Sequence, residues 1–226
     1  MNTRMPLFVS FAVVVAMLAI SVWWSFHLPV NAGIPMHWNA DGQPDRFAYG
    51  PLAVFLTPAI TALVAMVFWA IPWLEPRRFN IAASGKFYRA VWICTILLLA
   101  STHGAALYMS LHTGTNVSNV VVAAVCLLII VVGNYLGKTR SMFLVGVRTP
   151  WTLTSEYSWQ RTHSLAGKLF IAAGALGFAA AIALPAKEAS HVVLYAMGVS
   201  VVVSVIASYV YWRRDPLRHT GDGTPE

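Results

Sequence analysis

Three side chains able to bind a metal ion lie close together in one polar loop of the chain. His37, Asp41 and Asp45 are spaced four residues apart in the stretch IPMHWNADGQPDRFAYG, and imidazole and carboxylate groups are common metal ligands. The stretch does not follow the calcium loop of an EF-hand, because Gly42 is out of place and Gly50 stands where the bidentate Glu belongs. We therefore keep two hypotheses for this loop, a metal site and a structured turn.

A second candidate for chemistry is an acid–base pair of Glu156 and His163. However, the sequence has no nucleophile elbow, zinc-helix motif, phosphate loop or dinucleotide fingerprint. We predict that the chain is not an enzyme and uses no cofactor, with a metal-dependent membrane enzyme at the outer loop as an alternative. His103 is the one ionisable residue deep inside an apolar run, which indicates either a small transporter or channel lined near it or a hydrogen bond between helices.

The elements that position these residues are apolar runs long enough to cross a bilayer. The chain has 226 residues, of which 58% are hydrophobic and 10% charged, whereas a soluble domain carries about 25% charged residues. Runs of about 20 apolar residues recur along its whole length. They predict an all-α, polytopic membrane protein, a single bundle over residues 1–226, with six transmembrane helices at 6–26, 51–74, 88–111, 118–136, 166–185 and 191–212.

The orientation of this bundle follows from its basic residues. Of the 15 Lys and Arg residues, all but Arg46 and Lys187 fall on one side of the predicted spans, and basic residues accumulate on the cytoplasmic side of membrane proteins. We predict that both termini and the loop 137–165 are cytoplasmic and that the loop 27–50 is extracytoplasmic. The formal charge of +7 then needs no nucleic acid as a partner, and we predict none.

The cytoplasmic loop has local signals of its own. Pro150 keeps Thr149 out of helical geometry, and Thr154 is a good N-cap for a short helix that reaches His163. Such a helix could lie in the membrane interface or form a docking surface for a cytoplasmic partner. Arg148 could bridge open carbonyls or lipid phosphate through its planar guanidinium.

Small residues recur four apart along the predicted fifth helix. Ala173, Gly177 and Ala181 share one face, and small residues let helices approach closely in lipid. The stripe indicates close packing within the chain or, alternatively, the seam of a homo-oligomer.

Two stretches of the chain resemble known sequence signatures. The segment GNYLGKTRSMFLVGVRTPWTLTSEYSWQRTHSLAGKLF closely resembles the signature of the SdpI family of bacterial membrane proteins, and the outer stretch resembles an N-terminal module often found with it. The resemblance implies modules near 8–60 and 118–200. Its inner motif residues are Asn134, Tyr135, Arg148, Thr149, Pro150, Trp151, Thr152, Trp159, His163 and Lys168, and its outer ones are Pro35, His37, Trp38, Asn39, Gly42 and Asp45.

The resemblance also implies a location and a function. Members are multi-pass proteins of the bacterial plasma membrane, and the family's namesake protects its producer from a secreted peptide toxin. It also signals, by holding a cognate transcriptional repressor at the membrane. The expected partners are therefore the lipid bilayer, a peptide toxin outside and a cytoplasmic repressor.

Overall fold

The computed structural model describes residues 2–29, 31–112 and 117–217, so residue 30 of the predicted outer loop lies outside the described part. Six helices are long and apolar enough to cross a membrane, as the sequence predicted. Within the described residues the helices are α1 (Arg4–Ser25), α2 (Leu56–Leu74), α3 (Arg78–Ala83), α4 (Gly85–Leu111), α5 (Ser118–Leu136), α6 (Pro150–Thr154), α7 (Glu156–Ala183) and α8 (Ala186–Arg213).

Short elements complete the chain at one end of the bundle. A 3-10 turn, Ala53–Phe55, precedes α2, and strands β1 (Ile34–Trp38) and β2 (Pro44–Ala48) form an antiparallel hairpin. The hairpin pairs Ile34 with Ala48 and Trp38 with Pro44, with irregular register between these pairs. The all-α prediction therefore needs one small addition, a hairpin in the loop between α1 and α2.

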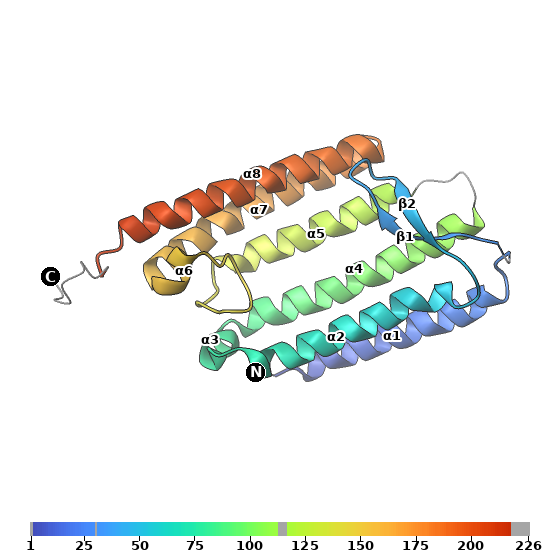
Figure 1. Ribbon diagram of the computed structural model, residues 1–226, viewed down its shortest axis with the longest axis horizontal. Coiled ribbons are helices and arrows are strands. Elements are labelled where there is room, and N and C mark those ends of the chain that lie inside the picture. The colour runs from blue at the N-terminus through green and yellow to red at the C-terminus, as the bar shows by residue number, and fades with distance from the viewer. Residues whose placement is uncertain (1, 30, 113–116, 218–226) are drawn as a thin grey trace.

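The six long helices form two groups joined through α4. Helices α1 and α2 pack on α4 from one side, α5 packs on it from the other, and α7 and α8 follow α5 (Figure 1). The start of α1 and the end of α8 lie at the same end of the bundle, opposite the hairpin.

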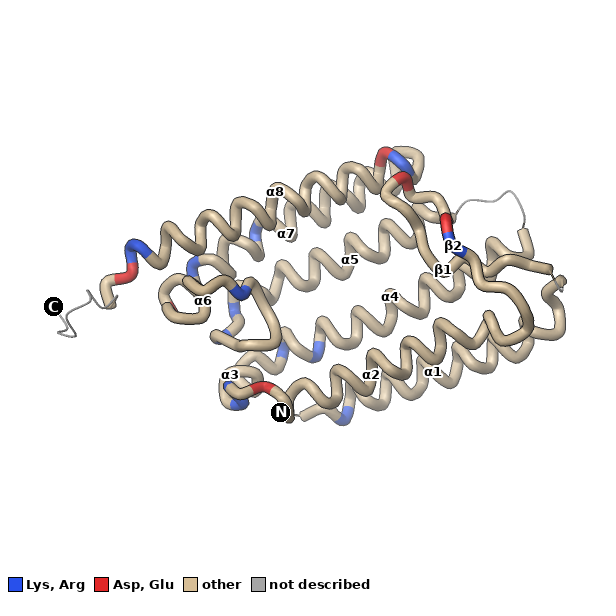
Figure 2. The backbone as a smooth tube through the Cα atoms, in the orientation of Figure 1, with Lys and Arg blue, Asp and Glu red and all other residues tan. Residues whose placement is uncertain are grey.

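Basic residues gather at the end that carries α3 and α6, which we call the basic end (Figure 2). Arg77 and Arg78 lie at the start of α3, Lys138 and Arg140 follow the end of α5, and Arg148 precedes α6. The opposite end, which we call the hairpin end, carries β1 and β2.

Close helix packing inside the chain uses the small residues of α7. A Cβ atom added to Gly133 would lie 2.7 Å from the carbonyl oxygen of Gly167, and one added to Gly167 would lie 2.6 Å from that of Gly133. Further along α7, Ala173 and Ala181 are buried, and Gly177 faces side chains of α5 and α8. The small-residue stripe thus packs within the chain.

The prediction of a short helix that begins at Thr154 and ends near His163 is wrong. Thr154 ends α6, and Ser155 is the residue that caps α7 by accepting a hydrogen bond from the Ser158 amide. The chain then continues as one helix from Glu156 to Ala183 instead of a short helix followed by a separate span. A single residue in extended conformation, Ser155, separates α6 from α7, and no sequence signal distinguished it from its hydroxyl-bearing neighbours.

The charge asymmetry leads to a labelling experiment. In a variant with Cys94 and Cys126 replaced by Ala, a cysteine at exposed Ala40 should react with an impermeant maleimide in intact cells. A cysteine at exposed Thr154 should react only after permeabilisation, because the basic end is expected in the cytoplasm. Reaction of both positions from the same side would contradict the six-span topology.

Candidate functional site

The loop from Gly137 to Thr149 crosses the basic end and is held by a buried carboxylate. Glu75, at the end of α2, is 0% exposed. Its Oε1 accepts hydrogen bonds from the amides of Arg77 at 3.1 Å and Phe143 at 3.0 Å, and its Oε2 accepts one from the Leu144 amide at 2.8 Å. Hydrogen bonds to an ionised acceptor are stronger than neutral ones, so this carboxylate ties the loop to α2.

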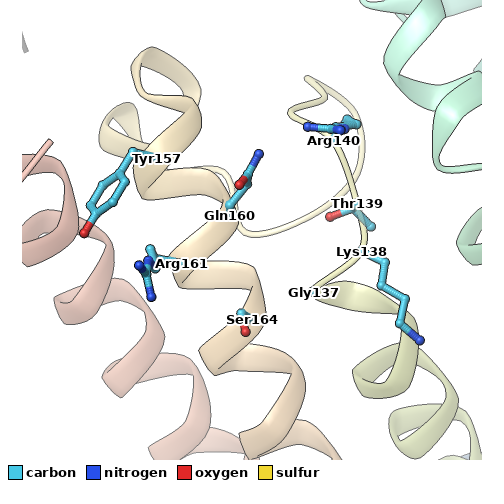
Figure 3. A pocket seen from close by; sticks show the side chains of 8 residues that line it. All are labelled: Gly137, Lys138, Thr139, Arg140, Tyr157, Gln160, Arg161 and Ser164. Carbon is cyan, nitrogen blue, oxygen red and sulfur yellow. The ribbon is translucent and has the colours of Figure 1, made fainter. Parts of the chain in front are cut away.

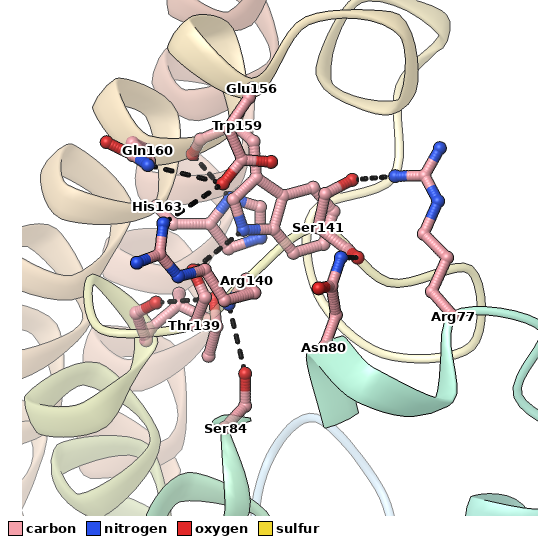
Figure 4. A network of polar contacts seen from close by, with 11 residues as sticks. Arg77, Asn80, Ser84, Thr139, Arg140, Ser141, Glu156, Trp159, Gln160 and His163 are labelled. Atoms are coloured by element: carbon pink, nitrogen blue, oxygen red, sulfur yellow. Dashed lines mark hydrogen bonds and ion pairs between the residues drawn. The ribbon is translucent and has the colours of Figure 1, made fainter. Parts of the chain in front are cut away.

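The start of the same loop is bonded to α3 and α4 (Figure 4). The Arg140 amide donates to the Ser84 hydroxyl at 3.0 Å, and the Asn80 side-chain amide donates to the Ser141 carbonyl at 2.8 Å. Arg77 donates both to the Ser141 hydroxyl and to the carbonyl of Leu153 in α6. Side chains of α3 and of the residues on either side of it thereby satisfy polar groups of a loop that has no regular structure of its own.

Trp159 and His163 bind the loop from the α7 side. The Trp159 indole donates to the Thr139 carbonyl at 3.0 Å, and the two rings stack with centroids 3.9 Å apart. His163 Nδ1 lies 2.8 Å from the Trp159 carbonyl, so it is assigned as the protonated nitrogen, and Nε2 accepts from the Val147 amide at 2.9 Å. Both side chains are 0% exposed, so they pack inside the basic end and neither is part of an exposed surface.

Gly146 allows this close approach of loop and helix. Its φ of +117° lies in a region that favours glycine. A Cβ atom at this position would come within 2.6 Å of His163 Nε2. The glycine of the predicted motif is thus required both by backbone conformation and by space.

The Arg-Thr-Pro-Trp-Thr motif shapes the end of the loop and α6. Arg148 is exposed, and its Nη1 donates one hydrogen bond to the Phe143 carbonyl at 2.9 Å. Thr149 and Thr152 form a capping box, with Pro150 in the first turn. Trp151 packs edge-to-face on a tyrosine of α8, with ring centroids 5.2 Å apart.

The remaining motif residues lie at the crossing of α5 and α7. Asn134 and Lys168 directly follow the two glycines of that crossing, and both are exposed. The Tyr135 ring lies 5.5 Å from the Lys138 ammonium. These residues border the loop. In the part of the chain that the structure describes, they do not take part in the hydrogen-bond network around Glu75.

At the hairpin end, the three candidate metal ligands do not converge, because His37 and Asp45 pair with each other and Asp41 pairs with residues of α8. His37 Nδ1 lies 2.6 Å from Asp45 Oδ1, and this hydrogen bond holds the pKa of the exposed Asp45 carboxyl below its usual value. Asp41 instead faces α8, 3.2 Å from His191 Nε2 and 3.7 Å from Lys187 Nζ. Within the described residues no group of three or more His, Cys, Asp or Glu side chains could hold a metal ion.

The other outer motif residues build the hairpin. The Asn39 side-chain oxygen accepts hydrogen bonds from the backbone amides of Asp41 and Gln43, and Gly42 has a φ of +67° in the turn. Pro35 is buried, and Trp38 packs against the apolar cluster beneath the strands. The structured turn is thus present, in the form of a hairpin with its tip against α8.

His103 lies inside the membrane-spanning part of the bundle and joins α4 to α1. It is 3% exposed, and its Nε2 lies 3.2 Å from the Ser21 hydroxyl, which itself donates to the Val54 carbonyl. This arrangement favours the hydrogen-bond interpretation of His103 over a pore-lining one.

Two important residues were missed from the sequence. Glu75 was not singled out, although a carboxylate directly after an apolar span and before Pro76 could have marked it. Ser208 was also missed. Its hydroxyl accepts from Thr149 at 3.0 Å, and its carbonyl accepts from the Ser158 hydroxyl at 2.8 Å. With Ser200 and Ser204 it forms a row of serines spaced four apart in an apolar helix, and that spacing, which puts the three on one face, could have marked it.

Comparison with known proteins relates both modules to described families. Residues 138–211 match the model of the SdpI/YfhL protein family, and residues 12–62 match that of a domain of unknown function (DUF1648). The chain is similar to the immunity protein SdpI of Bacillus subtilis (strain 168), with 24% identity over 181 residues, which cover 80% of this chain and 84% of that protein. No solved structure matches the chain.

The bonded loop yields a prediction for Glu75. Glu75→Ala should lower the free energy of unfolding by about 3 kcal/mol, roughly 1 kcal/mol for each amide that loses its acceptor. The measurement is denaturant unfolding of the purified protein in detergent micelles. Glu156→Ala is the matched control, because that carboxylate is half-exposed, and we expect a change within about 0.5 kcal/mol. Equal, small effects of both substitutions would contradict the role given to Glu75.

Proposed function

We propose, since its residues 138–211 match the model of the SdpI/YfhL protein family, that this multi-pass membrane protein protects the cell that makes it against a secreted peptide toxin. The observation that carries the proposal is the extent of the similarity to the immunity protein SdpI. It covers 84% of that protein and so is not confined to one motif. The protein would act in the bacterial plasma membrane, without catalysis.

The orientation of the protein supports an outer site for the toxin. With the basic end in the cytoplasm, the hairpin end faces the outside, where a secreted peptide arrives. The rings of Phe47 and Tyr49 both lie close to Gly33 and are 43% and 68% exposed. Exposed aromatic groups at a membrane surface suit contact with an apolar peptide.

Signalling, as the second part of the proposal, would use α8 as the connection between the two ends. At the hairpin end, Asp41 contacts Lys187 and His191 in the first two turns of α8. At the basic end, Ser208 in the last turns of α8 bonds both Thr149 and Ser158. One rigid element therefore touches the outer hairpin and the inner loop.

A ligand that shifts the hairpin could favour one of two positions of α8, and with it one arrangement of the inner loop. This mechanism is a population shift, in which the ligand binds one arrangement better than the other. The loop 137–149 and α6 would then present or withhold the surface that a cytoplasmic repressor binds.

Protection can be tested at the outer aromatic patch. In toxin-sensitive cells expressing the protein at matched membrane levels, Phe47→Ala with Tyr49→Ala should reduce protection about tenfold or more, since buried aromatic anchors carry much of the energy of an interface. Phe79→Ala is the control, because Phe79 is 91% exposed at the basic end, and it should protect like the unchanged protein. Full protection by the double variant would rule out this patch.

Signalling can be tested separately at the contact between hairpin and α8. Alkylation of a cysteine at Thr154 is measured with and without toxin. Toxin should change its rate in the unchanged background, and Asp41→Asn should remove the change by weakening the contact with α8. Asp45→Asn breaks only the pair with His37 inside the hairpin and should keep it. A toxin response that persists in Asp41→Asn would contradict coupling through α8.

A further inference from the structure

A polar pocket at the basic end is not used by the proposed function. It has a volume of about 530 Å³ and lies between the segment after α5 and the first turns of α7. Figure 3 shows Gln160 and Ser164 on the face of α7 turned toward that segment, with Arg140 across from Gln160. The lining residues are Gly137, Lys138, Thr139, Arg140, Tyr157, Gln160, Arg161 and Ser164.

The charge of this pocket fits an anion. Three lining residues are cations, and none is a carboxylate. The carboxylate of Glu156, which does not line the pocket, lies 3.7 Å from Arg140 Nη1 and accepts a hydrogen bond from Gln160. Both members of that ion pair are half-exposed, so the pair is weak and its arginine is available to a stronger anion. Three cations against one carboxylate leave an excess of two positive charges.

The donors of the pocket suit a phosphate group in particular. Guanidinium groups bind phosphate through paired N–H donors, and Arg140 and Arg161 supply two of them. The Gln160 amide and the hydroxyls of Tyr157 and Ser164 add neutral donors around the same space. The Arg161 guanidinium lies 5.5 Å from the Tyr157 ring, which limits how it can turn away.

The surface next to the pocket indicates a phosphate that belongs to a lipid. Gln160, Ser164, Lys168 and Ile171 are spaced four, four and three residues apart on α7, so they share one face, and all four are exposed. The face runs from polar donors, through an ammonium group, to an apolar side chain within the membrane-spanning part of α7. A phospholipid presents its headgroup, phosphate and acyl chain in the same order. Basic pockets of this kind beside cytoplasmic helix ends are suited to anionic headgroups.

We infer that this pocket binds the headgroup phosphate of an anionic phospholipid, with the acyl chains lying along the face of α7 that contains Ile171. Bound there, the lipid bridges the segment 137–140 and α7. It thereby adds a lipid contact to the same loop that Glu75 holds from the other side.

The test compares the binding of two lipids to the purified protein in detergent by native mass spectrometry. Phosphatidylglycerol should bind more tightly than phosphatidylcholine. Replacing Arg140 and Arg161 together by Gln should weaken phosphatidylglycerol binding about 25-fold, roughly fivefold for each charge. Replacing Arg213 and Arg214 together by Gln removes the same charge from exposed sites on α8 and its end and should leave binding within about twofold.

A second variant and a competitor keep the outcome clear. Ser164→Asp places a negative charge in the pocket at an exposed position and should also weaken phosphatidylglycerol binding while leaving phosphatidylcholine unaffected. Equal losses in the two arginine pairs would overturn the site, because bulk charge would then suffice. Displacement of the lipid by millimolar inorganic phosphate would overturn the lipid as the source of the phosphate. A purified cytoplasmic protein that needs the same arginines, with no lipid preference, would assign the pocket to a protein partner instead.

Discussion

The hydrogen bonds of one buried carboxylate organise the basic end of this protein. Glu75 directly follows the apolar helix α2 and is 0% exposed, and a buried charged group is stable only with hydrogen-bond donors around it. Two of the donors, the Phe143 and Leu144 amides, belong to a loop that has no strand or helix to satisfy them, and the third is the nearby Arg77 amide. The loop amides give the buried carboxylate its donors, and the carboxylate gives the amides an acceptor, so neither pays the cost of an unpaired buried group. The pairing also joins the first part of the chain, which ends in α2, to the loop before α6.

Other contacts of the loop depend on that arrangement. With Phe143 and Leu144 held at α2, the chain turns at Gly146 and places the Val147 amide against His163. Trp159 then closes the apolar cluster that α2, α3 and α4 share at this end. The loop is thus a fixed surface between the two halves of the bundle, which suits a role in binding a partner or a lipid.

Much of the fold could be predicted from sequence because lipid imposes a strong constraint. A run of about 20 apolar residues must satisfy its backbone internally and so forms a helix, and the six predicted spans agree with the observed ones to within a few residues, apart from the start of α7. That start differs because Ser155, rather than Thr154, caps α7, and because the helix runs without a break past His163. Neighbouring hydroxyl residues offer equivalent caps, and tertiary packing decides among them.

The site was less predictable for a related reason. The motif that holds Arg148, Trp159 and His163 was found from sequence, but burial of the two rings depends on the loop that covers them. Glu75 and Asn80 hold that loop, and they lie 61 to 69 residues before the loop residues that they bind. Contacts of that separation leave no periodic pattern. In the hairpin, likewise, spacing suggested that Asp41 belonged with His37, whereas the turn at Asn39 directs it to α8.

The most direct test of this account is amide hydrogen exchange of the loop in the intact, membrane-reconstituted protein. Phe143, Leu144 and Val147 donate their amides to side chains of Glu75 and His163 rather than to regular secondary structure. If the loop is the fixed surface described, these three amides should exchange at least about a hundredfold more slowly than an unstructured peptide. Exchange within about tenfold of the unstructured rate would show that the loop opens freely and would contradict the account.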